Sequence, residues 1–281
     1  MAFKDKDLLK PSVYALLVGM IVSAIGIIPL AGASFFLNGS QIGNFILFVL
    51  GGILVFVQFV VTYVFSGMTV YLIYGYLTEG DGRMDKAWAI VRRDFFDIIT
   101  LAAASTAVNM LRSLANRNRS GIAGNLARSA TGLLQTLWTE AAYLILPAMV
   151  IDDLNLKNGM QRVLNITKEN LLLIGISTVG VRFVTGLIGF LFGALGFAIG
   201  FTVGGGAAYV SGGSTAVSVV GIVIGALIFF AFVMVSSIFS SYTNTAYNTC
   251  LYIWARDVET AKAQGSSVQV RAPAPLAAAL A

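Results

Sequence analysis

The chain has 281 residues, of which 57% are hydrophobic and only 11% are charged, with a net charge of +5 and no histidine. A soluble globular domain is about one quarter charged, so this composition excludes a water-exposed surface over most of the chain. The absence of histidine removes the usual general base near neutral pH and the commonest metal ligand. The single cysteine, Cys250, excludes an intrachain disulfide. We therefore expect an all-α, polytopic membrane helix bundle.

The first half of the chain predicts four transmembrane spans and one surface helix. A bilayer core of about 30 Å requires about 20 apolar residues of helix. The spans are expected at 11–36, 43–77, 98–114 and 131–151, with an amphipathic helix at 83–97 in the membrane interface. The segment 43–77 is too long for one perpendicular crossing, so it should tilt strongly or project beyond the membrane as a continuous helix.

The second half predicts another surface helix and two more spans. An amphipathic helix is expected at 152–170, with Asp152 or Asp153 capping its start. The spans at 171–203 and 215–254 are joined by a glycine-rich turn that reaches Ser214. Residues 1–262 then form the transmembrane domain, and 263–281 have the composition of a disordered tail.

The two amphipathic segments share a register, which predicts a parallel internal repeat of span, surface helix and span. At one constant offset, Met84, Ala87, Trp88 and Val91 align with Leu156, Gly159, Met160 and Val163.

Positive charge predicts the orientation of the chain. Cytoplasmic loops carry an excess of Lys and Arg, and placing both termini and both surface helices inside collects thirteen of the eighteen. We expect a multi-pass protein of the cell (plasma) membrane with both termini cytoplasmic. The arginine-rich connection between the third and fourth spans then falls outside. Alternatively, these two spans form a shallow re-entrant pair and the arginines face inward.

Two segments resemble a known family. The first runs from Trp138-Thr139-Glu140 through Pro147 and Asp152-Asp153 to Met160, Val163 and Leu164, and the second from Asn244-Thr245-Ala246-Tyr247 through Tyr252 to Ala255-Arg256. They resemble a prokaryotic six-span membrane family of unknown function, which is similar in pattern to the membrane domain attached to some glycerophosphodiester phosphodiesterases. The resemblance covers about residues 60 to 256 and implies a six-span fold, but it implies little about function. Asn165-Ile166-Thr167 departs from the family's basic-Ser pair.

Two charged residues fall inside predicted spans, Glu140 and Arg182. At 1.5 Å per residue both would be about 17 Å deep, where an isolated charge costs about 3 kcal/mol or more. We therefore predict that they form an intramembrane ion pair. The pair either marks a transport path or is a structural bridge between the fourth and fifth spans.

Small residues form a stripe on each of the last two spans. Such faces allow helix backbones to approach closely in lipid, so they predict either packing within the hairpin or self-association. The helix-packing residues are Gly186, Gly189, Gly193, Gly196, Gly200 and Gly204 on one span, with Ser214, Ser218, Gly221 and Gly225 on the other.

Two polar groups of residues each allow two interpretations. The last span carries hydroxyl and amide side chains that either bond their own backbone or line a hydrated cavity: Ser236, Ser237, Ser240, Ser241, Thr243, Asn244, Thr245, Asn248 and Thr249. Four arginines, Arg112, Arg117, Arg119 and Arg128, either contact lipid phosphates or form a solvated connection.

The sequence favours a non-enzymatic function with no cofactor. It contains no carboxylate pair at useful spacing, no nucleophile with an evident base and no cofactor loop. We expect a structural or scaffolding membrane component that binds lipids, self-associates or joins a membrane complex, and does not bind nucleic acid. The alternative is a small-solute or lipid transporter or channel that uses the Glu140–Arg182 region.

Overall fold

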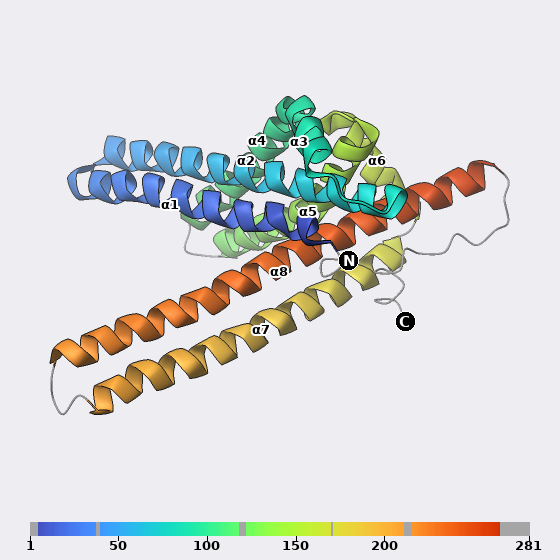
Figure 1. The fold of residues 1–281 in the computed structure, drawn as a ribbon. Coiled ribbons are helices and arrows are strands. Elements are labelled where there is room, and N and C mark those ends of the chain that lie inside the picture. The colour runs from blue at the N-terminus through green and yellow to red at the C-terminus, as the bar shows by residue number, and fades with distance from the viewer. Residues whose placement is uncertain (1–4, 38–39, 118–121, 170, 211–214, 265–281) are drawn as a thin grey trace.

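The computed structural model describes residues 5–37, 40–117, 122–169, 171–210 and 215–264 (Figure 1). Within these ranges the chain forms only helices. They are η1 (Lys6–Leu9), α1 (Lys10–Leu37), α2 (Gln41–Glu79), α3 (Met84–Arg93), α4 (Phe95–Arg117), α5 (Ile122–Asp152), α6 (Leu156–Glu169), α7 (Leu171–Val210) and α8 (Thr215–Ala263). The predicted all-α class is therefore confirmed.

Six of the described helices are long and apolar enough to cross a membrane: α1, α2, α4, α5, α7 and α8. Their apolar stretches also lack a compensating protein core, since none of the most apolar stretch of α1 or α2 is buried within the chain. Lipid is the solvent that suits such surfaces, and the chain is a membrane-embedded protein. The short helices α3 and α6 correspond to the two predicted amphipathic segments.

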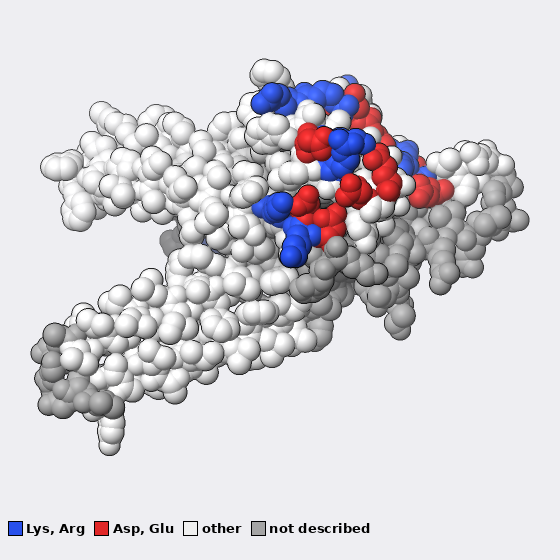
Figure 2. Space-filling model, in the orientation of Figure 1, with Lys and Arg blue, Asp and Glu red and all other residues white. Residues whose placement is uncertain are grey.

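The spans form three consecutive hairpins that diverge from one end of the molecule (Figure 1). The α1–α2 and α7–α8 hairpins both extend away from this end, and they separate from each other with distance from it. We call the end itself the base, and it comprises η1, α3, α6, the last turns of α2, and the last turns of α8. On the visible face, Lys, Arg, Asp and Glu gather over the base, while the extended hairpins are uncharged (Figure 2).

The hydrophobic core lies where the hairpins meet the base. Fully buried side chains come from the second half of α2, from both surface helices and from the ends of α5 and α8. Leu8 of η1 is completely buried and lies against Gly82 and Leu72, so the N-terminal segment is part of this core. The remainder of each hairpin exposes large apolar side chains.

The two halves of α2 have different surroundings, which accounts for the length of the segment 43–77. Gly67 packs level with Val91, Ile98 and Val150, near the start of α4 and the end of α5. From there α2 passes through the core of the base and continues unbroken to Glu79. Gly80 then ends the helix with a left-handed φ of 80°. The segment is one continuous helix, and the choice between tilting and projecting beyond the membrane stays a prediction.

The surface helices repeat the same burial pattern at equivalent positions. Ala87 and Gly159 are buried, as are Val91 and Val163, while Trp88 and Met160 are exposed. In both helices the inner positions therefore pack on the protein core, while Trp88 and Met160 are left to face the surroundings. The predicted helix at 83–97 is divided, however, because α3 ends at Arg93 and α4 begins at Phe95.

Three predicted boundaries are wrong. Neither Asp152 nor Asp153 caps α6. The Asn155 side chain accepts the Asn158 N–H instead, and Asp153 adopts a left-handed φ of 53°. Helix α7 does not end near residue 203 but continues to Val210, because Gly204 still packs on Gly221 of α8. Helices α4 and α5 extend through most of the predicted arginine-rich connection, and both are long enough to cross a 30 Å core.

Candidate functional site

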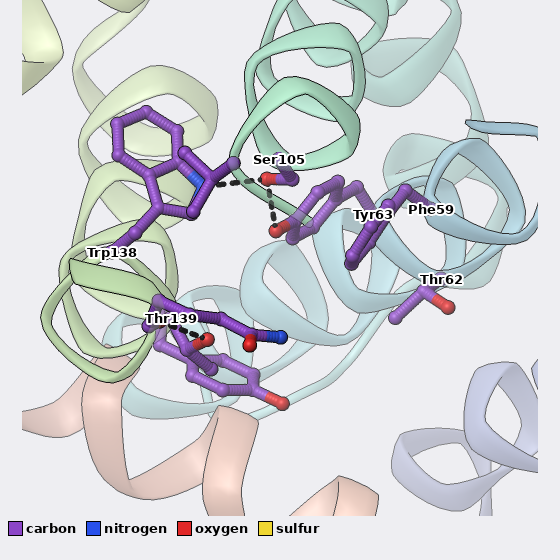
Figure 3. A pocket seen from close by; sticks show the side chains of 9 residues that line it. Phe59, Thr62, Tyr63, Ser105, Trp138 and Thr139 are labelled. Atoms are coloured by element: carbon purple, nitrogen blue, oxygen red, sulfur yellow. Dashed lines mark hydrogen bonds between the residues drawn. The ribbon is translucent and has the colours of Figure 1, made fainter. Parts of the chain in front are cut away.

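A small cavity lies inside the bundle, between α2, α4 and α5 (Figure 3). Its volume is about 70 Å³. Since a water needs roughly 10–15 Å³ of such volume, the cavity has room for a few waters. It is far smaller than a typical small-molecule site of about 300–1,000 Å³. The lining residues are Phe59, Thr62, Tyr63, Ser105, Val108, Gln135, Trp138, Thr139 and Tyr143.

Ser105 joins the three helices around the cavity. Its hydroxyl accepts a hydrogen bond from Trp138 Nε1 at 2.8 Å and lies 2.8 Å from the Tyr63 hydroxyl (Figure 3). The indole N–H can only donate, and Ser105 provides the acceptor it needs. Tyr143, which also lines the cavity, is hydrogen-bonded to the Asn244 side chain of α8. The cavity wall therefore connects four helices by polar contacts.

The cavity lies near the middle of the predicted membrane core. Ser105 follows Asp97 by eight residues, and Tyr143 precedes Asp152 by nine. At 1.5 Å per residue these are about 12 and 14 Å along the helices from charged groups of the base. Polar groups at this depth stabilise helix contacts, because the surrounding hydrocarbon offers them no partner.

Glu140 follows Thr139 of the cavity wall and is partly exposed. Arg182 lies in α7, but its side chain is outside the described part of the structure. The Glu140–Arg182 ion pair therefore stays a prediction.

Gln58, which joins α1 to α2, was not among the predicted residues. Its Nε2 donates to the carbonyl of Gly19 at 2.8 Å and to Ser23 Oγ at 2.6 Å. The sequence contained a signal for this contact, because Gln58 is a lone amide in an apolar segment and an amide in lipid requires hydrogen-bond partners.

The arginines are divided between helix ends. Arg112 lies in α4, is exposed and donates a hydrogen bond to Gln135 Oε1 of α5. Arg128 lies in α5 and is also exposed. The side chain of Arg117 and the whole of Arg119 lie outside the described residues. The four arginines do not belong to one loop, since three of them lie in the neighbouring helices α4 and α5.

The glycine stripe on α7 is used unevenly. A Cβ at Gly200 would lie 2.5 Å from the Gly225 carbonyl oxygen, and one at Gly225 would lie 2.3 Å from the Gly200 carbonyl oxygen. Only glycine permits this backbone contact between α7 and α8. Gly196 and Gly221 also pack closely on the opposite helix, whereas Gly189 and Gly204 are in ordinary contact. Gly186 and Gly193 face open space.

Three residues of the polar run of α8 bond the backbone of their own helix. Ser237 donates to the Val233 carbonyl at 2.9 Å, and Thr249 to the Thr245 carbonyl at 2.7 Å. Asn248 donates to the Asn244 carbonyl at 2.9 Å. Of the two interpretations, these contacts favour the structural one, since a hydroxyl or amide bonded in this way is satisfied without solvent.

The charged side chains of the base form a network that fastens α5 and α6 to the end of α8. Asp152 accepts hydrogen bonds from Tyr252 and from Arg256, the latter at 3.1 Å. Arg162 of α6 pairs with Glu259 at 2.5 Å. Asp152, expected to be a helix cap, therefore binds the last helix instead.

Asp94, between α3 and α4, is the most buried carboxylate of this network. Burial raises its pKa above the usual value, and the hydrogen bond from Arg93 opposes that rise. Arg93 also lies 3.2 Å from Asp153. One arginine therefore connects the α3–α4 and α5–α6 junctions.

Comparison of the chain with protein-family models, with curated proteins and with solved structures finds no match. The resemblance to the six-span family therefore stays an expectation.

Two residues that organise the cavity, Tyr63 and Ser105, were not predicted. Each lies in an apolar span with no distinctive neighbours in sequence, and their hydroxyls meet only because α2 and α4 pack together. Trp138 was part of the family resemblance, but its N–H partner could not be assigned without the helix arrangement.

Proposed function

We propose that this chain is a structural component of the plasma membrane, a scaffold that holds partner transmembrane helices and associates with further copies of itself. Both termini are placed in the cytoplasm. The support for that orientation is the concentration of Lys and Arg at the base, which also contains the N-terminal segment and the last turns of α8.

The α7–α8 hairpin provides the main support. Helix α7 packs extensively only on α8, so the hairpin extends from the base with little contact to the other spans. Its outer surface includes long apolar side chains that are more than half exposed: Phe190, Leu191, Phe197 and Phe201. A long, two-helix arm of this kind offers a large lateral surface to other membrane helices.

Two glycines at the edge of the arm favour self-association. A Cβ at Gly186 or Gly193 would meet no atom of the chain within 4 Å, so these positions are not required for the hairpin. In lipid, helices associate through faces where small residues allow the backbones to approach. Gly186 and Gly193 provide such a face for a second copy.

Gly193→Leu tests this association directly. The leucine enters open space within its own chain, so the fold should persist while the approach of a second copy is blocked. The native mass in mild detergent should fall from oligomer to monomer. Gly32→Leu, which also enters open space but on α1, is the matched control and should leave the oligomer intact. A wild-type chain that is monomeric at all protein concentrations would refute self-association.

The alternative is a transporter or channel that uses the Glu140 region, and the cavity beside Thr139 is the observation in its favour. The two functions differ in the hydration of this cavity. In a Cys250→Ser background, Thr139→Cys should resist a water-soluble maleimide if the protein is a scaffold. Rapid labelling, compared with an exposed cysteine placed at Lys157, would favour the transporter.

A further inference from the structure

We propose that the α4–α5 hairpin binds one anionic phospholipid, with the phosphate at Arg112 and an acyl chain in the groove between α2 and α4. This site lies on a different part of the molecule from the α7–α8 arm. It does not depend on the scaffold function.

The arginines of this hairpin lie apart from its carboxylates, which are Asp97 near the start of α4 and Glu140 and Asp152 in α5. Residues 98–139 contain four arginines and no aspartate or glutamate. Elsewhere, Lys and Arg side chains pair with a carboxylate of the same or a neighbouring helix, as Lys10 does with Asp7 and Arg162 with Glu259. Among the described residues Arg112 contacts the neutral Gln135 amide and no carboxylate, so an anion that neutralises it comes from outside the described part of the chain.

Arg112 is placed to bind such an anion. It follows Asp97 by fifteen residues, which is about 22 Å along α4, on the membrane side away from the base. Its hydrogen bond to the neutral Gln135 amide is the only polar contact it makes among the described residues. A guanidinium has five N–H donors, so most of them stay available to phosphate oxygens.

An open groove of about 400 Å³ lies between α2 and α4, and its wall includes residues that flank Arg112 in the sequence, although not Arg112 itself. On α2 its wall is apolar and includes Leu47, Phe48 and Val55. On α4 its wall includes Asn109 and Ser113, which flank Arg112 at three residues before it and one after it. The apolar wall suits a hydrocarbon chain, and the polar wall suits the ester and glycerol groups that join that chain to a phosphate.

The depth of the groove selects a lipid rather than free phosphate. The lining of the groove is mostly hydrocarbon, which gives inorganic phosphate no favourable contact. A phospholipid places its charge at the arginine and its chain along α2 simultaneously. Phosphate and acyl chain therefore reinforce one another only when they belong to one molecule.

The first experiment measures lipid binding to the purified full chain by native mass spectrometry in detergent. Dioleoyl phosphatidylglycerol should bind more tightly than dioleoyl phosphatidylcholine, and Arg112→Gln should weaken the former about fivefold, the ratio for roughly 1 kcal/mol per arginine. Arg112→Lys should retain most of the preference, because the charge is kept. Equal binding of the two lipids, or a preference that survives Arg112→Gln, would overturn the proposal.

The second experiment separates the groove from the charge. Gly51 lines the groove and has no atom within 4 Å of an added Cβ, so Gly51→Leu fills the groove without a clash. This variant should weaken phosphatidylglycerol binding, whereas Gly32→Leu on α1 should not. Unchanged binding in Gly51→Leu would exclude the acyl-chain part. An equal thermal stabilisation by inorganic phosphate would show an anion site without a lipid, and it would also overturn the proposal.

Discussion

Gly200→Ala is the sharpest test of how α7 and α8 are held together. The added Cβ would lie 2.5 Å from the Gly225 carbonyl oxygen, about 0.9 Å inside ordinary contact, and both groups are backbone or attached to it. Neither can rotate away, so the two helices must separate. Overpacking of this kind costs about 1–3 kcal/mol, and it acts against a gain of up to about 1 kcal/mol from replacing a helical glycine.

A control variant removes the helix propensity from the comparison. Gly206→Ala lies in the same helix and meets no atom within 4 Å, so it receives the same gain without the clash. The free energy of unfolding, measured by SDS titration from detergent micelles, should be about 1–3 kcal/mol lower for Gly200→Ala than for Gly206→Ala. Equal stabilities would refute the close backbone contact and the hairpin geometry that depends on it.

Two further predictions concern polar groups. Ser105→Ala leaves the Trp138 N–H and the Tyr63 hydroxyl without their shared partner, so it should lower the unfolding free energy by about 1–2 kcal/mol, whereas Ser113→Ala at the open groove should have little effect. Because burial raises the pKa of Asp94, its carboxyl stabilises the fold most when protonated, and this contribution is lost as pH rises through the raised pKa. Asp94→Asn should therefore gain thermal stability relative to wild type between pH 4 and 7; a pH-independent difference would contradict this.

Local sequence determined most of the secondary structure. Each apolar run of membrane length became a helix, because a chain in lipid must satisfy its backbone groups within the segment. Ala87 and Val91 share a register with Gly159 and Val163 in the sequence, and the structure buries all four, since a helical face repeats every 3.6 residues. The internal repeat that this register predicts stays a prediction. These features depend on neighbours a few residues apart, which the sequence displays directly.

The tertiary structure alone decided which polar side chains meet. Asp152 was expected to cap α6, yet it binds Tyr252 and Arg256, a hundred residues further along the chain. Ser105 became the shared partner of Tyr63 and Trp138 for the same reason. Each hydroxyl, amide or carboxylate can form hydrogen bonds with many other polar groups. Only the packing of the helices selects which of these pairs forms.

The division of the glycine stripe shows the same limit in one helix. From sequence, Gly193 and Gly200 are equivalent members of a small-residue face. In the folded chain a Cβ at Gly200 would meet the backbone of α8, whereas one at Gly193 would meet no atom within 4 Å, although Gly189 and Gly196 on either side of it both contact α8. Composition and periodicity determined that this protein is a membrane-embedded helix bundle. The packing of its helices decided which surfaces stay exposed and available to partners.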